Sequence, residues 1–457
     1  MALPLYVQAA WFGGALLFIV GLKGMSSPAT ARRGIVFAGY GMILAIAGTF
    51  FIPGLRNLGL MVAALALGGA SAWISGRRVK MTDMPQMVAI YNGMGGGAAA
   101  AIAAVEFARG STHDGVTTGL AVIGALIGAV SFTGSCVAWA KLQGVLKRAV
   151  RLPGQNALNL ILAAVAVGLG ALLVALAPAR SEAILAFFAV ALILGLVVTL
   201  PIGGADMPVV ISLFNAFTGL AVGFEGYVLG NPALVIAGIV VGAAGTLLTQ
   251  LMAKAMNRPL SNILFTPITG AASGGEAIAG TMKEVGAIDA AALMRYASTV
   301  IDVPGYGMAV AHAQHKVWEM AVLLEEAGVT VKFAIHPVAG RMPGHMNVLL
   351  AEAGVPYDKI FDLDEINGEF AQADVALVIG ANDVVNPVAR TDKSSPIYGM
   401  PILNADQAQN VIVVKRGKGT GYSGVENALF YTDNCRMLYG DAQPAIAEVI
   451  QQLKALG

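Results

Sequence analysis

The stretch STVIDVPGYGMAVA, residues 298–311, separates a long apolar half of the chain from a half of ordinary globular composition. Within it an apolar, β-branched run ends at Pro304, and a glycine turn at 305–307 opens a helix-like segment that we expect at 308–327. A strand, a tight glycine turn and a helix N-terminus together cradle a pyrophosphate, because glycine lets the backbone approach the phosphates and the free N–H groups of the helix favour negative charge. Val310 stands where the usual third glycine would be, so a plain turn of a βαβ unit is the alternative interpretation.

The composition assigns the first half of the chain to a membrane. Hydrophobic residues make up 57% and charged residues 12% of the 457 residues, and the shortage of charge, relative to the usual quarter, falls before residue 256. The formal net charge is +1 and no basic run is interleaved with aromatic residues, so we expect no nucleic-acid partner. Cys136 and Cys435 lack the spacing of a disulfide framework or a metal site, so we expect no metal.

Nine apolar runs are each long enough to cross a hydrocarbon core of roughly 30 Å, which takes about 20 residues. The expected spans are 4–23, 34–53, 55–74, 84–107, 117–141, 157–177, 181–201, 206–229 and 232–254. Most of the Lys and Arg residues between them lie in the first, third and fifth connections, which the positive-inside rule places in the cytoplasm. The N-terminus is then outside, and the second half of the chain is cytoplasmic.

A short motif occurs twice in the membrane half. The sequence DMP at 83–85 leads to Asn92, and DMP at 206–208 leads to Asn215, each asparagine nine residues after the aspartate. Aspartate suits a helix N-cap and proline suits the first turn, which places both asparagines roughly 13 Å deep, near the bilayer midplane. They could bond each other, bond backbone, or line a water-filled path; plain interhelical hydrogen bonding is the alternative. Ser131, Thr133 and Ser135 of the fifth span either extend this polar strip or bond back to their own helix.

Groups that titrate are missing from the middle of the predicted spans. No span has His or Lys near its centre, and asparagines and hydroxyls do not titrate near neutral pH. Glu106 and Glu225 are expected near the outer ends of their helices, at the interface and not at mid-membrane. If protons cross, a titrating group must come from elsewhere.

The second half alternates short β runs with helical ones, which predicts a parallel, doubly wound, Rossmann-like sheet. We expect strands at 299–303, 329–335, 359–362, 374–380, 411–415 and 435–439, and helices at 308–327, 346–354 and 442–455. Before it, proline and glycine residues break any continuous element in 257–295, which is typical of a hinge. The predicted domains are 1–256 in the membrane, 257–295 as connector and 296–457 as the nucleotide-binding domain.

The ends of the predicted strands indicate which dinucleotide binds. NAD-specific sites usually have Asp or Glu at the end of the second strand, where this chain has Ile335 and His336. Lys415 and Arg416 instead follow the fifth strand, and adjacent cations suit a 2′-phosphate, which favours NADP; a solvated basic pair is the alternative. His336, His345 and Asp383 suggest acid–base chemistry, but hydride transfer between two nicotinamides releases no proton, so such residues need only orient the cofactor.

Ten segments together resemble one family over nearly the whole chain, the β subunit of the proton-translocating NAD(P)+ transhydrogenase. The segments are MTDMPQMVAIYN, SFTGS, GGADMP, KAMNR, VPGYGMAVA, HPVAGRMPGHMNVLLAEA, VIGAND, VVKR, GYSGV and YGDA. In that family nine β-subunit helices join helices of an α chain in the proton-conducting domain. The soluble β domain binds NADP(H), and a separate α domain binds NAD(H).

The resemblance implies a role for each matching residue. Residues 305–310 would hold the pyrophosphate with Arg341, Lys415 and Arg416 would hold the 2′-phosphate, and Tyr422 would sit on a lid. Asp383 and Tyr306 would orient the nicotinamide end without acid–base chemistry. The implied cofactor-binding residues are Gly305, Tyr306, Gly307, Met308, Ala309, Val310, His336, Val338, Ala339, Gly340, Arg341, Gly380, Ala381, Asn382, Asp383, Lys415, Arg416, Gly421, Tyr422, Gly440, Asp441 and Ala442. The implied proton path includes Asn92, Ser135, Asp206 and Asn215.

One departure from the family pattern affects the proton path. Many members have His where this chain has Asn92, and similar members with Asn there are thought to receive the histidine from an α-type partner. The resemblance implies an α partner, a dimer of such assemblies, a multi-pass place in the bacterial inner membrane, and the reaction NADH + NADP+ + H+ (outside) = NAD+ + NADPH + H+ (inside). A channel or transporter with a nucleotide-sensing domain is the alternative, and a quinone-linked redox enzyme is a third, without a haem-like histidine pair or a cysteine cluster to support it.

Overall fold

The computed structural model describes residues 3–110, 114–146, 149–176, 180–204, 206–265, 280–342, 344–417, 419–421 and 423–456. The chain forms two compact units. One comprises Met1–Pro201 and Val210–Thr249, and the other comprises Ile202–Val209 and Gln250–Gly457. Each is described by itself.

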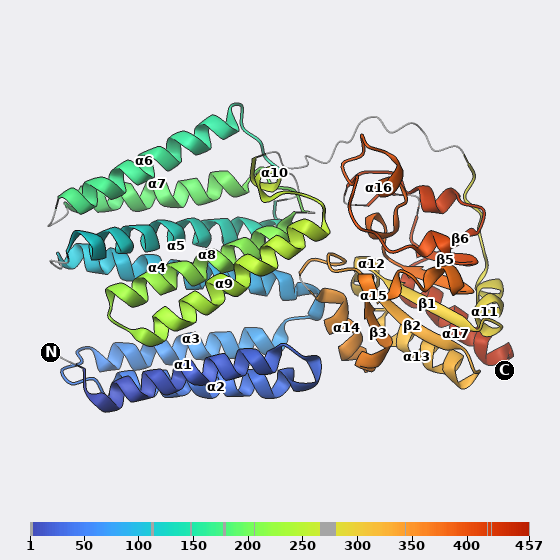
Figure 1. The fold of residues 1–457 in the computed structure, drawn as a ribbon, viewed down its shortest axis with the longest axis horizontal. Helices are drawn as coiled ribbons and strands as arrows, with labels where there is room; N and C mark the ends of the chain where they lie inside the picture. The colour runs from blue at the N-terminus through green and yellow to red at the C-terminus, as the bar shows by residue number, and fades with distance from the viewer. Residues whose placement is uncertain are drawn as a thin grey trace. The chain divides into compact units, whose positions relative to one another are not determined.

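The membrane half is α-helical, as predicted. Among the described residues, nine helices are long and apolar enough to cross a membrane (Figure 1). They are α1 Leu5–Met25, α2 Pro28–Phe50, α3 Leu58–Arg78, α4 Met84–Arg109, α5 Gly115–Leu142, α6 Gln155–Ala175, α7 Ser181–Thr199, α8 Met207–Val228 and α9 Pro232–Ala255. Their order and number confirm the hydropathy prediction.

Glycine residues let these helices approach one another closely. A Cβ atom added at Gly96 of α4 would lie 2.9 Å from the carbonyl oxygen of Gly128 on α5. One added at Gly219 of α8 would lie 2.5 Å from the amide nitrogen of Gly242 on α9. Apolar side chains gain little by leaving lipid for a helix interface, so close backbone packing is what holds membrane helices together.

The first DMP motif begins α4 as predicted, with Asp83 at the N-cap and Pro85 in the first turn. The Asp83 side chain, however, makes no capping hydrogen bond. It accepts instead from Nε2 of Gln86 at 3.4 Å. The backbone of Asp83 (φ −101°, ψ 0°) continues a 3₁₀ turn, η1 Met81–Asp83, and does not have the extended conformation that is usual at an N-cap.

The second unit contains a six-stranded parallel sheet in the order β3-β2-β1-β4-β5-β6. The strands are β1 Thr299–Pro304, β2 Thr330–Ile335, β3 Ile360–Asp362, β4 Val375–Ile379, β5 Asn410–Lys415 and β6 Cys435–Tyr439. The strand order reverses between β1 and β4, which confirms the doubly wound fold and places its switch point there. All five residues of β4 are buried, as expected of a parallel strand covered on both faces.

Helices and turns cover both faces of this sheet (Figure 1). On one face α11 Ala287–Arg295 and α13 Gln314–Glu326 pack against α17 Ala442–Leu456. On the other, Ile301 and Val303 of β1 share a core with Phe370 and Phe430. The remaining elements are α10 Leu260–Phe265, α12 Tyr306–Val310, α14 His345–Ala353, α15 Leu363–Ile366, α16 Val388–Thr391, η2 Tyr357–Lys359, η3 Phe370–Gln372, η4 Asp383–Val385, η5 Ala405–Gln407 and η6 Ala428–Tyr431.

The single helix predicted at 308–327 is wrong, because α12 ends before α13 begins. His312 lies in the left-handed region at φ +52°. The N–H of Ala313 donates to Met308 O and that of His312 to Ala309 O, each at 3.1 Å. This is the hydrogen-bond pattern of a Schellman cap, which usually has glycine at the left-handed position. Apolar periodicity continues across the break, so the sequence pattern could not reveal it.

The prediction that no continuous element forms within 257–295 is also wrong, because α10 and α11 lie there. Residues 266–279 are outside the described residues. Just before α11, Glu284 forms a parallel bridge with Met437 of β6, and Lys283 pairs with Asp433 at 2.9 Å. The last part of the predicted connector is therefore built into the α/β fold.

Candidate functional site

A cavity opens at the carboxyl edge of the sheet, where parallel sheets of this kind bind ligands. Turns that follow β1, β2, β4, β5 and β6 form its walls. Within residues 296–456 the lining residues of this carboxyl-edge cavity are Gly305, Tyr306, Gly307, Val338, Ala339, Gly340, Arg341, Gly380, Ala381, Asn382, Asp383, Val384, Pro396, Ile397, Met400, Val414, Lys415, Arg416, Thr420, Gly421, Ser423, Gly440 and Ala442.

Two glycine turns pack backbone to backbone at the switch point. A Cβ atom at Gly305 would lie 2.5 Å from the backbone of Ala381, and one at Gly307 would lie 2.7 Å from Gly380 Cα. The N–H of Gly305 donates to Ile379 O and that of Gly307 to Gly380 O, both at 2.9 Å. The N–H groups of Gly305 and Gly307 are therefore not free to bind a ligand. Packing of the β1 turn on the β4 turn requires the glycines and uses their donors.

Arg341 brings a positive charge to the cavity beside that turn. Its guanidinium carbon lies 4.4 Å from the centre of the Tyr306 ring, a cation–π distance. Its backbone N–H donates to Nδ1 of His345 at 3.1 Å. Burial, aided by the charge of Arg341, lowers the pKa of His345 to about 4. His345 is therefore a neutral ring at neutral pH that accepts at Nδ1 and fixes the Arg341 loop.

His336, directly after β2, is a structural residue. It is 1% exposed, its Nδ1 accepts from the N–H of Val338 at 3.2 Å, and its Nε2 donates to Pro401 O at 2.8 Å. Burial lowers the pKa of His336 to about 4. His336 does not line the carboxyl-edge cavity, so its contacts support a structural role and not acid–base chemistry.

Lys415 and Arg416 reach the cavity from the end of β5. The Lys415 ammonium lies 4.4 Å from the centre of the Phe430 ring and donates to Gly419 O. Burial lowers the pKa of Lys415, and the negative charge of Asp383 opposes that shift. Arg416 pairs with Asp441 at 2.9 Å, and because both side chains are well exposed such a pair contributes only about 0–1 kcal/mol. An anion can therefore replace Asp441 beside Arg416 at little cost.

Asp383 follows β4 and holds the glycine-rich loop that follows β5. Its carboxylate accepts from the N–H of Ser423 at 3.0 Å and from the Ser423 hydroxyl at 2.7 Å. A Cβ atom at Gly421 would lie 2.7 Å from Asp383 Cγ, so only glycine lets the loop close on this carboxylate. Asp383 is the only carboxylate among the cavity residues within 296–456 that the structure describes.

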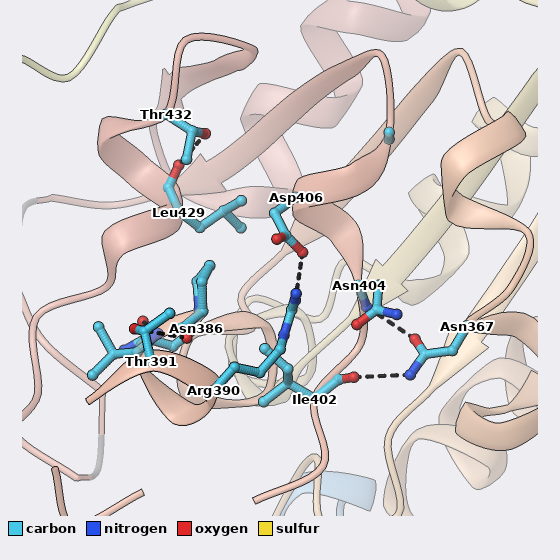
Figure 2. A network of polar contacts seen from close by, with 12 residues as sticks. Asn367, Asn386, Arg390, Thr391, Ile402, Asn404, Asp406, Leu429 and Thr432 are labelled. Atoms are coloured by element: carbon cyan, nitrogen blue, oxygen red, sulfur yellow. Dashed lines mark hydrogen bonds and ion pairs between the residues drawn. The ribbon is translucent and has the colours of Figure 1, made fainter. Parts of the chain in front are cut away.

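Polar contacts join the segments on either side of the loop at 396–400, whose residues Pro396, Ile397 and Met400 line the cavity. Arg390, before the loop, pairs with Asp406, after it, at 2.6 Å (Figure 2). The Asn367 amide donates to Ile402 O at 2.9 Å. These contacts tie the two segments together.

The structure gathers most of the residues expected in the cofactor site around one cavity. Those that do not line it are Met308, Ala309, Val310, His336 and Asp441, and Tyr422 lies outside the described residues. Within 296–456, the lining residues absent from the predicted cofactor site are Val384, Pro396, Ile397, Met400, Val414, Thr420 and Ser423. Three of them had a signal in the sequence, since Val414 lies in VVKR, Ser423 in GYSGV and Thr420 in the glycine-rich loop between these motifs. The other four are apolar residues without a motif.

The polar strip expected in the membrane half exists, and its hydrogen bonds join three helices. Asn92 of α4 donates to the Ser135 hydroxyl of α5 at 3.1 Å. Ser131, also on α5, shares a 2.7 Å hydrogen bond with Thr218 of α8 and donates to Phe214 O at 2.9 Å. Thr218 was not predicted. Asn215, one turn before Thr218, is half-buried.

Asp206, expected on the proton path, forms a buried ion pair. Both carboxylate oxygens lie 2.9 Å from a guanidinium nitrogen of Arg258, and the side chains are 0% and 10% exposed. Removing one partner of such a pair leaves an uncompensated charge, which costs about 3–5 kcal/mol. The ion pair joins the residue before α8 to the segment that follows α9.

Comparison with known proteins agrees with this arrangement. The family model described as NAD(P) transhydrogenase beta subunit matches residues 7–452. Two relatives from Rhodospirillum rubrum, each named NAD(P) transhydrogenase subunit beta, are 45% identical to the chain over 463 residues, which is 98% of this chain and 98% of the relative.

Proposed function

This chain belongs to the family of NAD(P) transhydrogenase beta subunits, and from that premise we propose that its α/β domain binds NADP(H) and accepts hydride from NADH held by a partner α subunit. The observation that carries the proposal is the convergence of Arg341, Lys415 and Arg416 on one cavity at the carboxyl edge. Three cations in one cavity suit a ligand with several phosphate groups.

The preference for NADP over NAD rests on what stands at two strand ends. The residue after β2 is His336, whose two ring nitrogens are bonded to backbone, so no carboxylate there bonds a ribose hydroxyl. Lys415 and Arg416 instead present an ammonium and a guanidinium after β5, and Arg416 is released from Asp441 at little cost. The 2′-phosphate is assigned to this pair and the pyrophosphate to Arg341 beside Tyr306.

When bound, the nicotinamide supplies the hydride chemistry, and the residues of this chain hold and orient the cofactor. His336 and His345, each with a pKa of about 4, are neutral at pH 7 and do not serve as proton donors there. Asp383 lies at the switch point, hydrogen-bonded to Ser423, and Tyr306 stacks under Arg341. We assign both to orienting the cofactor, and Ser423 to closing the loop over it.

The two cofactors differ by one phosphate group far from the nicotinamide, so the equilibrium constant for hydride transfer between them is close to one. A separate driving force is therefore needed. One charge crossing 100 mV supplies about 2.3 kcal/mol, nearly two decades in the equilibrium constant at about 1.4 kcal/mol per decade. We assign the proton path to the strip that includes Asn92, Ser135 and Asn215, with Asp206 at its cytoplasmic end. An α partner supplies the titrating group that the strip lacks at mid-depth.

The same proposal assigns the domains of the chain and their location relative to the membrane. The domains are 1–256 in the bacterial inner membrane, 257–295 as connector and 296–457 as the cytoplasmic NADP(H) domain, with the N-terminus outside and two α–β assemblies in one dimer. Protonation in the membrane alters how NADP(H) is held, through the connector. Locking the connector to the membrane domain is expected to uncouple turnover from proton movement.

Cofactor titration of the purified complex of this chain with its α partner tests the assignment. Lys415→Ala and Arg416→Ala should each weaken NADP+ binding by roughly tenfold to a hundredfold, since each removes a charged hydrogen bond, and should leave NAD+ binding unchanged. Lys316→Ala is the matched control, because Lys316 pairs with Glu319 on α13 and does not line the cavity. Unchanged NADP+ affinity in both Lys415→Ala and Arg416→Ala, or an equal loss of NADP+ affinity in Lys316→Ala, would contradict the proposal.

Proton coupling is tested with the complex in sealed vesicles. NADH-driven reduction of an NADP+ analogue is measured with and without an imposed pH gradient. A gradient that is more acidic outside should raise the rate and an ionophore should abolish the gain. A reduction rate that does not change with the gradient would refute proton coupling. It would not affect the assignment of the cofactor site.

A further inference from the structure

Glu225 is a fully buried carboxyl group near one end of the membrane bundle. It lies three residues before the end of α8 and is 1% exposed. Among the described residues, neither of its carboxylate oxygens has a hydrogen-bond partner. An ionised carboxylate without a partner is very costly inside a membrane protein, so the resting form of Glu225 is the neutral acid, which carries a proton. Glu225 lies near the end of its helix, as predicted, and its side chain is enclosed by the bundle.

The neighbouring helix leaves room for this carboxyl group. Gly124 of α5 faces Glu225, and a Cβ atom there would lie 2.8 Å from Glu225 Oε1. Any larger residue at position 124 would push the carboxyl group away. The bundle thus contains a space that fits an acid group, supplied by a glycine on the facing helix.

Glu106 of α4 is a second acid, and its negative charge acts on Glu225. Its side chain is the more exposed of the two, at 16%. Glu106 pairs with Arg109 at 3.7 Å, and the Arg109 side chain is 71% exposed. Exposure therefore falls stepwise from Arg109 through Glu106 to Glu225.

Helical spacing aligns these two acids with the polar strip. Glu225 follows Thr218 by seven residues, which is two turns of the same helix face and a separation of about 10 Å along α8. Glu106 follows Asn92 by fourteen residues, the same relation over four turns of α4. The facing residues of α5 between Gly124 and Ser131 include Ala125 and Gly128, both buried and small.

We propose that Glu225 and Glu106 form the proton-binding site at the outer end of the polar strip, a function that rests on the proposed proton translocation. Glu106, near the surface, takes a proton from the outer medium and passes it to ionised Glu225. Glu225 gives its proton to water or a hydroxyl of the strip on the side of Thr218. One proton enters and one leaves, both carboxyl groups return to their starting states, and no other reactant is needed.

The test uses the full complex in sealed vesicles with the pH gradient described above. Glu225→Gln keeps the shape and removes the exchangeable acid proton, and it should lower gradient-driven turnover by roughly a hundredfold, the usual cost of removing a positioned proton-transfer group. NADP+ binding should be unchanged. Glu182→Gln is the matched control, because Glu182 lies in the first turn of α7 and is exposed. We expect it to retain the full rate.

Two further measurements separate a proton site from a structural role. The infrared spectrum of the intact complex should show the C=O stretch of a protonated carboxylic acid that shifts in heavy water and is missing in Glu225→Gln. Gly124→Ala should lower the gradient-driven rate without removing that band. The proposal would be overturned if Glu225→Gln kept the gradient-driven turnover rate of the unaltered complex, or if that variant still showed the carboxylic-acid C=O band. If the pH gradient does not change the turnover rate of the unaltered complex, the proposed proton translocation is itself refuted.

Discussion

A methyl group added at Gly305 tests whether the glycine turn is needed for packing as well as for a ligand. In Gly305→Ala the new Cβ atom would lie 2.5 Å from the backbone of Ala381, whereas ordinary contact begins at about 3.4 Å. The β1 and β4 turns must therefore separate by 3.4 − 2.5, or about 0.9 Å. That movement stretches the hydrogen bonds from Gly305 N–H to Ile379 O and from Gly307 N–H to Gly380 O.

The magnitude follows from these contacts. Overpacking of a tight site costs about 1–3 kcal/mol, and each weakened hydrogen bond costs about 1 kcal/mol. The expected loss is therefore about 3–5 kcal/mol. For a domain of this size that lowers the melting temperature by roughly 6–20 °C, at about 2–4 °C per kcal/mol. NADP+ binding should fall as well, because the same turn lines the carboxyl-edge cavity.

Hydrogen exchange followed by mass spectrometry on the full complex, with a thermal melt in parallel, measures this effect. Exchange should accelerate in the peptides that cover the ends of β1 and β4. Gly368→Ala is the control, since a Cβ atom there meets open space, and it should be neutral or slightly stabilising. Equal melting temperatures and equal exchange in the two variants would refute the reasoning.

Two further predictions concern buried titratable groups outside the membrane. Asp302 of β1 is 1% exposed, and burial raises its pKa well above the ordinary value of 3.8. The contribution of Asp302 to the free energy of unfolding is therefore full below pH 3.8 and is lost as the pH rises through the raised pKa. Asp302→Val should therefore stabilise the α/β domain by about 1–3 kcal/mol near neutral pH, with a gain that grows above pH 3.8 in thermal melts; a constant or negative effect would contradict this. His336 has its pKa lowered from 6.5 to about 4, so its contribution is full above pH 6.5 and is lost as the pH falls toward 4, on the order of 3 kcal/mol. His336→Gln should reduce the pH dependence of the melting temperature between pH 4 and 6.5. An unchanged pH dependence in that variant would show that protonation of His336 does not destabilise the fold.

Apolar patterning predicted the fold because each pattern reports a local preference. A run of about 20 apolar residues is stable across lipid whatever its neighbours are, and an apolar β-branched run between helical segments indicates a buried parallel strand. The break at His312 escaped this reasoning, because a cap formed by a non-glycine residue at φ +52° leaves the apolar period intact.

The candidate site was predictable in its location and less so in its contacts. Strand ends rich in glycine and in cations pointed to the carboxyl edge, and the structure places Lys415 and Arg416 at the cavity there. The sequence pattern indicated a glycine turn at 305–307, but it did not show that the N–H groups of Gly305 and Gly307 are bonded to the end of β4 and the turn after it. The pairing of Asp383 with Ser423 joins residues forty positions apart, which no local pattern encodes.

The order of apolar and polar residues along the chain was enough to divide it into membrane and α/β halves, to predict that the strands form a parallel doubly wound sheet, and to locate the ligand edge. Those properties depend on how each segment partitions between water, lipid and a core, which is decided residue by residue. Only the folded structure decided that His336 is bonded to backbone, that Asp206 is paired with Arg258, and that Glu225 is enclosed without a hydrogen-bond partner among the described residues. Partners of this kind come from distant parts of the chain, so their energies depend on distances that only packing fixes.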